Sequence, residues 1–191
     1  MRVLRLIFLF LFFCCSLSYS SEYSREAFKH WTDIDHDHFD ARQQALKEQA
    51  VMQFNILHVN NSKHSVDFGT WLCPYTGRLI YDPSELDADH IVPLKWAWEH
   101  GAEKWDDAKR EMFANDQFNI ALVSNYINRA KGAKGPEEWL PPNLCNGYLY
   151  VLRFIAICDK YDLEYDKKYY NEILNFMQYY RNGIIPYKNP D

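Results

Sequence analysis

The strongest constraint on the fold lies in the centre of this 191-residue chain, where polar side chains recur at the ends of short apolar segments. A predicted strand ends at Asp89 and His90, a second strand opens at Asn119, and Asn128 follows nine residues later in a segment that Gly132 ends. Short segments bounded by turn residues are typical of strands, and glycine commonly ends a helix. The order therefore predicts two strands followed by a helix.

The rest of the chain predicts a single α+β domain over residues 21–191, since no internal repeat or Gly/Ser linker divides it. Short strands are expected between residues 70 and 92, where Thr76 and Gly77 are turn signals. Helical composition or apolar periodicity marks residues 39–53, 93–101, 103–114, 124–131, 147–160 and 167–180.

The first twenty residues have the layout of a secretory signal peptide. Arg2 and Arg5 precede an apolar run at residues 6–15, and the small residues Ser18 and Ser20 follow. A run of ten apolar residues is short of the roughly 20 that a membrane span needs, so stable membrane insertion is not expected. We expect cleavage after Ser20 and a secreted or periplasmic protein; an uncleaved anchor is the alternative.

Removal of that segment leaves three cysteines, and an oxidising destination permits one disulfide among them. Cys145 and Cys158 flank a predicted helix, which at 1.5 Å per residue would hold them about 15 to 20 Å apart, beyond the roughly 7 Å that a disulfide tolerates between Cα atoms. Cys73 is therefore expected to pair with one of the two, and the sequence leaves open which.

The charge balance excludes a protein that coats nucleic acid by bulk attraction. The formal net charge is −5, and it becomes −7 without the two arginines of the first twenty residues. Any contact with phosphate must come from a local basic patch or a bound cation.

The central polar residues supply the groups that phosphodiester hydrolysis needs. The carboxylate of Asp89 and the amide oxygen of Asn128 are ligands that a hard cation such as Mg²⁺ prefers. A neutral imidazole at His90 can take a proton from an attacking water near neutral pH. Basic side chains can neutralise phosphate oxygens, and the candidates are Lys95, Arg129, Lys131 and Lys134.

One geometric condition applies to Asp89 and His90. Adjacent side chains of a strand point to opposite faces, so the two reach one site only if the strand ends there. Pro93, just downstream, is consistent with such an end.

Several strings of the sequence match one family of enzymes: D-A-D-H-I-V-P at 87–93, F-A-N-D at 113–116, F-N at 118–119, N-R-A-K-G at 128–132 and E-W-L-P-P-N at 138–143. The chain resembles the HNH endonucleases of the ββα-metal superfamily, and in particular secreted bacterial HNH nucleases and the C-terminal HNH domain of GmrSD-type restriction enzymes. The resemblance implies an α+β fold whose ββα-metal (HNH) core, at about residues 71–163, is embedded in additional helices.

The resemblance also implies a role for each matched residue. His90 corresponds to the general base, Asp89 and Asn128 to the metal ligands, and Asn119 to an asparagine that braces the loop holding the base. The implied cofactor is a divalent cation, Mg²⁺ first, with Mn²⁺ and Ca²⁺ open. The chain departs from the family in carrying Asn128 where the name HNH has a histidine, and in lacking the zinc-binding cysteines of many members.

Together these features predict a secreted, metal-dependent endonuclease without sequence preference. We expect a monomer that acts on DNA, with RNA as a second candidate substrate. Two alternatives stay open: a catalytically silent nucleic-acid-binding protein at the cell surface, and a carbohydrate-binding protein that uses the tyrosines of the C-terminal helices. A silent protein would be expected to lack Asp89, His90 or Asn128, and all three are present.

An alternating acidic run, Asp33, Asp35 and Asp37, suggests a calcium loop at first sight. An EF-hand loop needs glycine at its sixth position and glutamate at its twelfth, whereas this chain has His38 and Gln44 there. We therefore predict a solvated entrance to the following helix. A fainter match to secreted relatives, W-x-D-x-D, begins just before this run.

Overall fold

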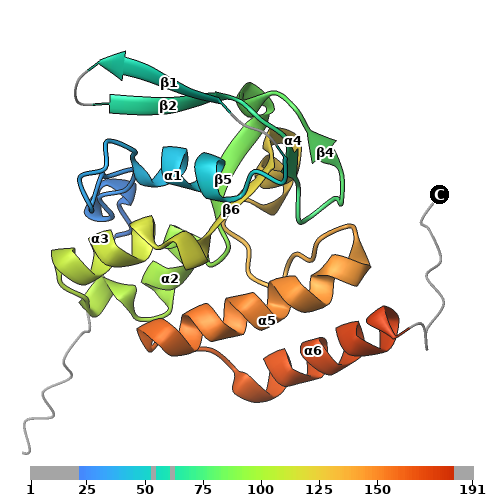
Figure 1. Ribbon diagram of the computed structural model, residues 1–191. Coiled ribbons are helices and arrows are strands. Elements are labelled where there is room, and N and C mark those ends of the chain that lie inside the picture. Colours follow the sequence, from blue (N-terminus) through green and yellow to red (C-terminus); the bar gives the residue numbers. More distant parts are fainter. Residues whose placement is uncertain (1–21, 53–54, 61–62, 183–191) are drawn as a thin grey trace, which may run out of the picture.

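The computed structural model describes residues 22–52, 55–60 and 63–182, so the predicted signal peptide lies outside the described residues. The fold is α+β, as predicted, with three small antiparallel sheets, of which the β1–β2 hairpin lies at the outer edge of the molecule (Figure 1). The helices are α1 Ala41–Glu48, α2 Leu94–Glu99, α3 Asp107–Asn115, α4 Asn125–Lys131, α5 Leu144–Tyr161 and α6 Lys167–Arg181. The strands are β1 Asn55–Asn60, β2 Lys63–Phe68, β3 Trp71–Leu72, β4 Leu79–Ile80, β5 Leu86–His90 and β6 Ile120–Ser124.

The ββα core consists of β5, β6 and α4. Strands β5 and β6 are antiparallel, with Leu86 opposite Ser124 and His90 opposite Ile120. All five residues of β6 are buried, which places this strand at the centre of the molecule. Helix α4 follows β6 directly and ends at Gly132, whose φ of +58° is a left-handed conformation that glycine adopts without strain. The predicted order of two strands and a helix is confirmed.

Helices α5 and α6 lie side by side along one side of this core (Figure 1). They approach closely at Gly147, where an added Cβ would lie 2.8 Å from the sulfur of Met177. Three tyrosines of these helices, Tyr150, Tyr161 and Tyr170, are buried in the core. These rings are therefore not available as a platform for sugar binding. Among the residues that the structure describes, no helix is long and apolar enough to span a bilayer.

The N-terminal half differs from the prediction in two places. Helix α1 ends at Glu48, before the predicted residue 53, because the side chain of Gln49 turns to β6 and bonds the carbonyl oxygen of Ile120 (3.0 Å) and the amide of Leu122 (3.0 Å). The hairpin of β1 and β2 was not predicted. Strand β1 has the apolar residues Ile56 and Leu57 side by side and β2 is mostly polar, so neither alternates strictly and periodicity gave no signal.

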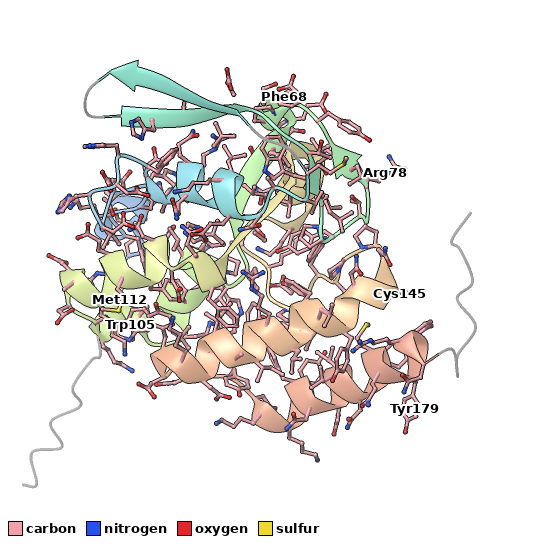
Figure 2. The ribbon with its side chains drawn as sticks, viewed as in Figure 1. Phe68, Arg78, Trp105, Met112, Cys145 and Tyr179 are labelled. Carbon is pink, nitrogen blue, oxygen red and sulfur yellow. The ribbon has the colours of Figure 1, made fainter. Side chains whose placement is uncertain are left out.

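The expected disulfide is wrong, because Cys73, Cys145 and Cys158 are all free thiols. Cys73 is buried with its sulfur 3.9 Å from the hydroxyl of Ser124. Cys158 is buried in the core, where burial raises the pKa of its thiol. Figure 2 shows Cys145 at the start of α5, and its side chain is exposed. The three sulfurs lie in separate environments, and none of these cysteines cross-links the core.

Candidate active site

The end of β5, the start of α2 and helix α4 meet around one cleft with a volume of about 300 Å³. Antiparallel pairing of β5 with β6 carries α4 back against β5, which brings together side chains that are distant in the sequence. The described residues that line the cleft are Tyr23, Arg25, Ala88, Asp89, His90, Pro93, Leu94, Lys95, Asn128, Arg129, Gly132 and Ala133.

His90 is the last residue of β5, and it lines the cleft together with Asp89 because the strand ends there. Its Nε2 donates a hydrogen bond to the carbonyl oxygen of Ala114 (2.7 Å), since a carbonyl can only accept. Nδ1 has no hydrogen-bond partner among the described residues. Burial lowers the pKa of His90 to about 3. At pH 7 the imidazole is thus neutral, and Nδ1 carries an unprotonated lone pair.

Asn119 holds the turn that follows His90. It is completely buried, its Oδ1 accepts a hydrogen bond from the amide of Val92 (2.9 Å), and its Nδ2 donates to the carbonyl oxygen of Val92 (3.3 Å). The carbonyl oxygen of Asn119 also accepts from the amide of Ile91 (2.8 Å). This side chain therefore acts on the backbone next to His90 and does not line the cleft.

Asp89 is held through both carboxylate oxygens. The hydroxyl of Tyr75 donates to Oδ2 (2.6 Å) and the ammonium of Lys131 donates to Oδ1 (2.9 Å). The ring of Tyr75 is fixed in turn by edge contacts with Trp139 and Tyr150. Burial raises the pKa of the Asp89 carboxyl, while the charge of Lys131 opposes that shift.

Lys131 is not one of the exposed basic residues that the sequence led us to expect at the substrate phosphates. Its side chain is fully buried, and besides Asp89 it bonds the carbonyl oxygen of His90 (2.8 Å). A lysine at the end of α4 faces β5 and not solvent, because α4 packs on that strand. Burial lowers the pKa of its ammonium group, and the neighbouring carboxylate counters this. Lys131 is therefore part of the support of the site and not of an exposed phosphate-binding patch.

Asn128 completes the set of oxygen donors. Its Nδ2 donates to Oδ2 of Asp87 (3.0 Å), so the amide is oriented and its Oδ1 remains free to act as a ligand. Asn128 and Asp89 line the same cleft. A carboxylate and an amide oxygen, with space for water, are donors that suit a hard cation such as Mg²⁺. The donor set thus fits the divalent cation that the HNH resemblance implies.

The remaining basic residues divide into two groups. Lys95 and Arg129 are exposed and line the cleft. Lys134 is exposed but lies outside the cleft, and its ammonium bonds the carbonyl oxygen of Ala130 (3.1 Å). Arg25 lines the cleft as well, from a short 3-10 helix at Arg25–Ala27. Two of the four predicted basic residues therefore reach the site, together with one that was not predicted.

Sequence reasoning missed five further contributors. Asp87 had a usable signal, because it precedes Asp89 by two residues on one strand and such residues share a face. Nothing local marked Tyr75 or the carbonyl group of Ala114. Arg25 and Trp31, which stacks on His90, come from a segment far upstream of β5.

The carboxylates of the acidic run before α1 accept hydrogen bonds from nearby backbone amides. Oδ2 of Asp33 accepts from the amide of His38 (3.0 Å), and Oδ1 of Asp37 accepts from the amide of Phe39 (3.0 Å). One carboxylate oxygen from each of Asp33, Asp35 and Asp37 lies within 4.8 Å of the others. Lys47 lies 3.4 Å from Asp37 and offsets part of the negative charge.

Comparison with known proteins gives one family and one relative. The family model of the C-terminal domain of GmrSD restriction endonucleases matches residues 50–176. An uncharacterized secreted protein of Arthroderma benhamiae is 36% identical over 143 residues, which cover 74% of this chain and 67% of the relative. No solved structure matches the chain.

Proposed function

This chain belongs to the family of C-terminal domains of GmrSD restriction endonucleases, and from that premise we propose that it is a secreted endonuclease that hydrolyses DNA with the help of a divalent cation. One observation carries the proposal: the cleft contains a neutral His90 with an unbonded Nδ1 and, beside it, the oxygen donors Asp89 and Asn128. General base and cation ligands in one cleft are what phosphodiester hydrolysis requires.

His90 acts as the general base. Its Nδ1 takes a proton from the attacking water, and the ring becomes an imidazolium with both nitrogens protonated. The carbonyl oxygen of Ala114, already bonded to Nε2, then faces a positively charged ring, and the hydrogen bond strengthens as the charge develops. Asn119 keeps the following turn in place, so the base does not move away from the cleft.

Asp89 and Asn128 would hold the cation. When bound, it supplies positive charge that stabilises the phosphate oxygens and the leaving group. Tyr75 and Lys131 keep the Asp89 carboxylate in one orientation, and Asp87 does the same for the Asn128 amide. Each ligand is therefore positioned by a second group before the cation arrives.

Arg25, Lys95 and Arg129 bind the phosphates of the substrate. All three are exposed and line the cleft. The chain as a whole carries a formal charge of −5, so these few contacts work against a repulsive background. Phosphate contacts do not distinguish bases, which supports cleavage without sequence preference and leaves RNA as a second candidate substrate.

A plasmid nicking assay tests the proposal. Purified residues 21–191 are incubated with supercoiled DNA and Mg²⁺, with and without a chelator, beside His90→Ala. Nicked and linear DNA should form only with the unaltered protein and the cation, while both proteins bind DNA equally. Binding without nicking in Mg²⁺, Mn²⁺ and Ca²⁺ would show instead a silent nucleic-acid-binding protein. Structured RNA in parallel tests the second substrate.

Secretion and monomeric state have their own tests. The signal peptide predicts that the protein recovered from the culture medium begins at Ser21, which N-terminal sequencing determines. Light scattering of that protein should give the mass of one chain. A protein retained in the cell with Met1 intact would contradict secretion.

A further inference from the structure

We propose that the segment at residues 22–40, ahead of the region that the family model matches, is part of the active site, and that Trp31 in it is a positioning residue for the imidazole of His90. The inference rests on the proposed role of His90 as the general base. The family match begins at residue 50, so it assigns nothing to this segment.

The first observation is a ring contact. The rings of Trp31 and His90 are stacked, with centroids 5.3 Å apart and planes inclined by 16°. Offset stacking at such separations is an attractive arrangement of aromatic rings. His90 lines the cleft, whereas Trp31 is not among the described residues that line it. His90 is thus held at its Nε2 edge by Ala114 and on one face by Trp31.

The second observation is the backbone of Trp31. Its φ is +58°, a left-handed conformation that costs a bulky L-residue free energy. A glycine would take this conformation without that cost. The presence of tryptophan where the backbone favours glycine indicates that the side chain itself is needed.

The third observation is a set of hydrogen bonds between the turn at Trp31 and α3, the helix whose Ala114 carbonyl accepts a hydrogen bond from His90. Asn115, the last residue of α3, is buried, and its Oδ1 accepts from the amide of Thr32 (2.9 Å). Its Nδ2 donates to the carbonyl oxygen of Lys29 (2.8 Å). Asn115 therefore fixes the backbone on both sides of Trp31, while its neighbour Ala114 accepts from His90. One helix end sets the positions of both stacked rings.

The stack has a chemical consequence. Rotation of the imidazole would move Nδ1 away from the attacking water, and misplacement of a reacting group by about 1 Å can cost 10²-fold in rate. Once His90 has taken a proton, the face of the indole also attracts the imidazolium. Trp31 therefore acts on turnover through His90, without touching the substrate.

The test compares Trp31→Gly, Trp31→Phe and Trp105→Ala. Trp31→Gly removes the ring and relieves the left-handed backbone, so the fold should persist. Trp31→Phe keeps a stacking ring. Trp105, which Figure 2 labels, lies just before α3. This partly buried tryptophan packs on Phe113 and Tyr161 and serves as the control. Cleavage is measured as kcat and KM at saturating Mg²⁺, and unfolding by urea.

We expect Trp31→Gly to lower kcat by about 10- to 100-fold with KM unchanged, and Trp31→Phe to recover most of the loss. Trp105→Ala should lose stability and keep kcat. Equal kcat in Trp31→Gly and the unaltered protein, or a loss in Trp105→Ala as large as in Trp31→Gly, would overturn the proposal.

A second readout does not depend on cleavage. Nitrogen-15 NMR of the histidine side chains should show His90 as the Nε2-protonated tautomer with ring protons shifted by the indole. In Trp31→Gly the ring-current shift should vanish, and the His90 ring signals should broaden as the imidazole samples more than one orientation, while the bond to Ala114 keeps the tautomer. Sharp His90 signals in a folded Trp31→Gly, altered only by the lost ring-current shift, would overturn the positioning role, whereas absence of cleavage by the unaltered protein would overturn the proposed function alone.

Discussion

The ammonium of Lys131 lies 2.9 Å from Oδ1 of Asp89, and both side chains are buried from solvent. The ion pair connects the end of α4 to the end of β5, which are the two elements that carry the proposed cation ligands. A second bond from Lys131 to the carbonyl oxygen of His90 ties the same ammonium to the proposed base. A single lysine thus links the carboxylate of Asp89 and the backbone of His90 to the end of α4.

We expect Lys131→Met to destabilise the protein by about 3–5 kcal/mol, because it leaves the buried carboxylate of Asp89 unpaired. Urea unfolding measures the loss, and Lys134→Met, on the exposed side of the same region, is the control. Mg²⁺ should restore part of the lost stability, since a cation bound to the folded state shifts the equilibrium. A loss below about 1 kcal/mol would mean that water or another cation replaces the ammonium.

His90→Ala and Asp89→Ala should fail in different ways. Loss of the base lowers kcat by about 10² to 10⁴, and added metal does not restore it. Loss of a ligand weakens cation binding, so part of the activity of Asp89→Ala or Asn128→Ala should return at high Mg²⁺ or Mn²⁺. Titration of activity against cation concentration distinguishes them. Rescue of His90→Ala by metal would reverse the assigned roles.

Arg25→Ala should weaken DNA binding and make it less sensitive to salt. Each phosphate contact contributes about 0.9 to the slope of log K against log salt, so removal of one contact lowers the slope by about one. Lys95→Ala and Arg129→Ala should behave alike, whereas Lys134→Ala, outside the cleft, should leave the slope unchanged. The measurement is the affinity of each variant for DNA from dilute to physiological salt, which gives the slope. Equal slopes in Arg25→Ala and the unaltered protein would remove Arg25 from the substrate contacts.

Stability should decrease as the pH falls below 6.5. Burial lowers the pKa of folded His90 to about 3, with Arg25 and Lys131 adding to the effect, while the unfolded chain protonates this histidine near pH 6.5. Between these values the unfolded state holds a proton that the folded state lacks, so the free energy of unfolding falls by about 1.4 kcal/mol per pH unit. Urea unfolding from pH 7 to pH 4.5 should show this slope, and His90→Asn should flatten it. Parallel curves for the two proteins would contradict a buried neutral imidazole.

Thiol labelling should reveal the arrangement of the cysteines. Cys145 is exposed and should react with a maleimide in the folded protein, whereas Cys73 and Cys158 are buried and should react only on unfolding. Mass spectrometry before and after denaturation counts the labelled thiols. A disulfide-linked peptide from Cys73 in the secreted protein would restore the bond that the sequence led us to expect.

Part of the site could be predicted from the sequence because it is local. Strands β5 and β6 and helix α4 are marked by short apolar segments, a glycine stop and the positions of Asp89, His90 and Asn128 along them. The end of β5 at His90, and hence the access of both residues to one cleft, follows from the same local signals. The holding of the turn by Asn119 agrees with the role that the family motif implies.

Contacts between segments that are distant in the sequence determined the remaining parts of the site. A lysine at the end of a short helix can face solvent or the sheet, and only the packing of α4 on β5 buries Lys131 against Asp89. Arg25 and Trp31 reach the site from the N-terminal segment and Tyr75 from a turn after β3, and no periodicity within one segment encodes where such segments pack. Local propensity thus determined the strands and the helix that present Asp89, His90 and Asn128. The free energy of burial across the whole chain determined which other side chains hold these three residues in place.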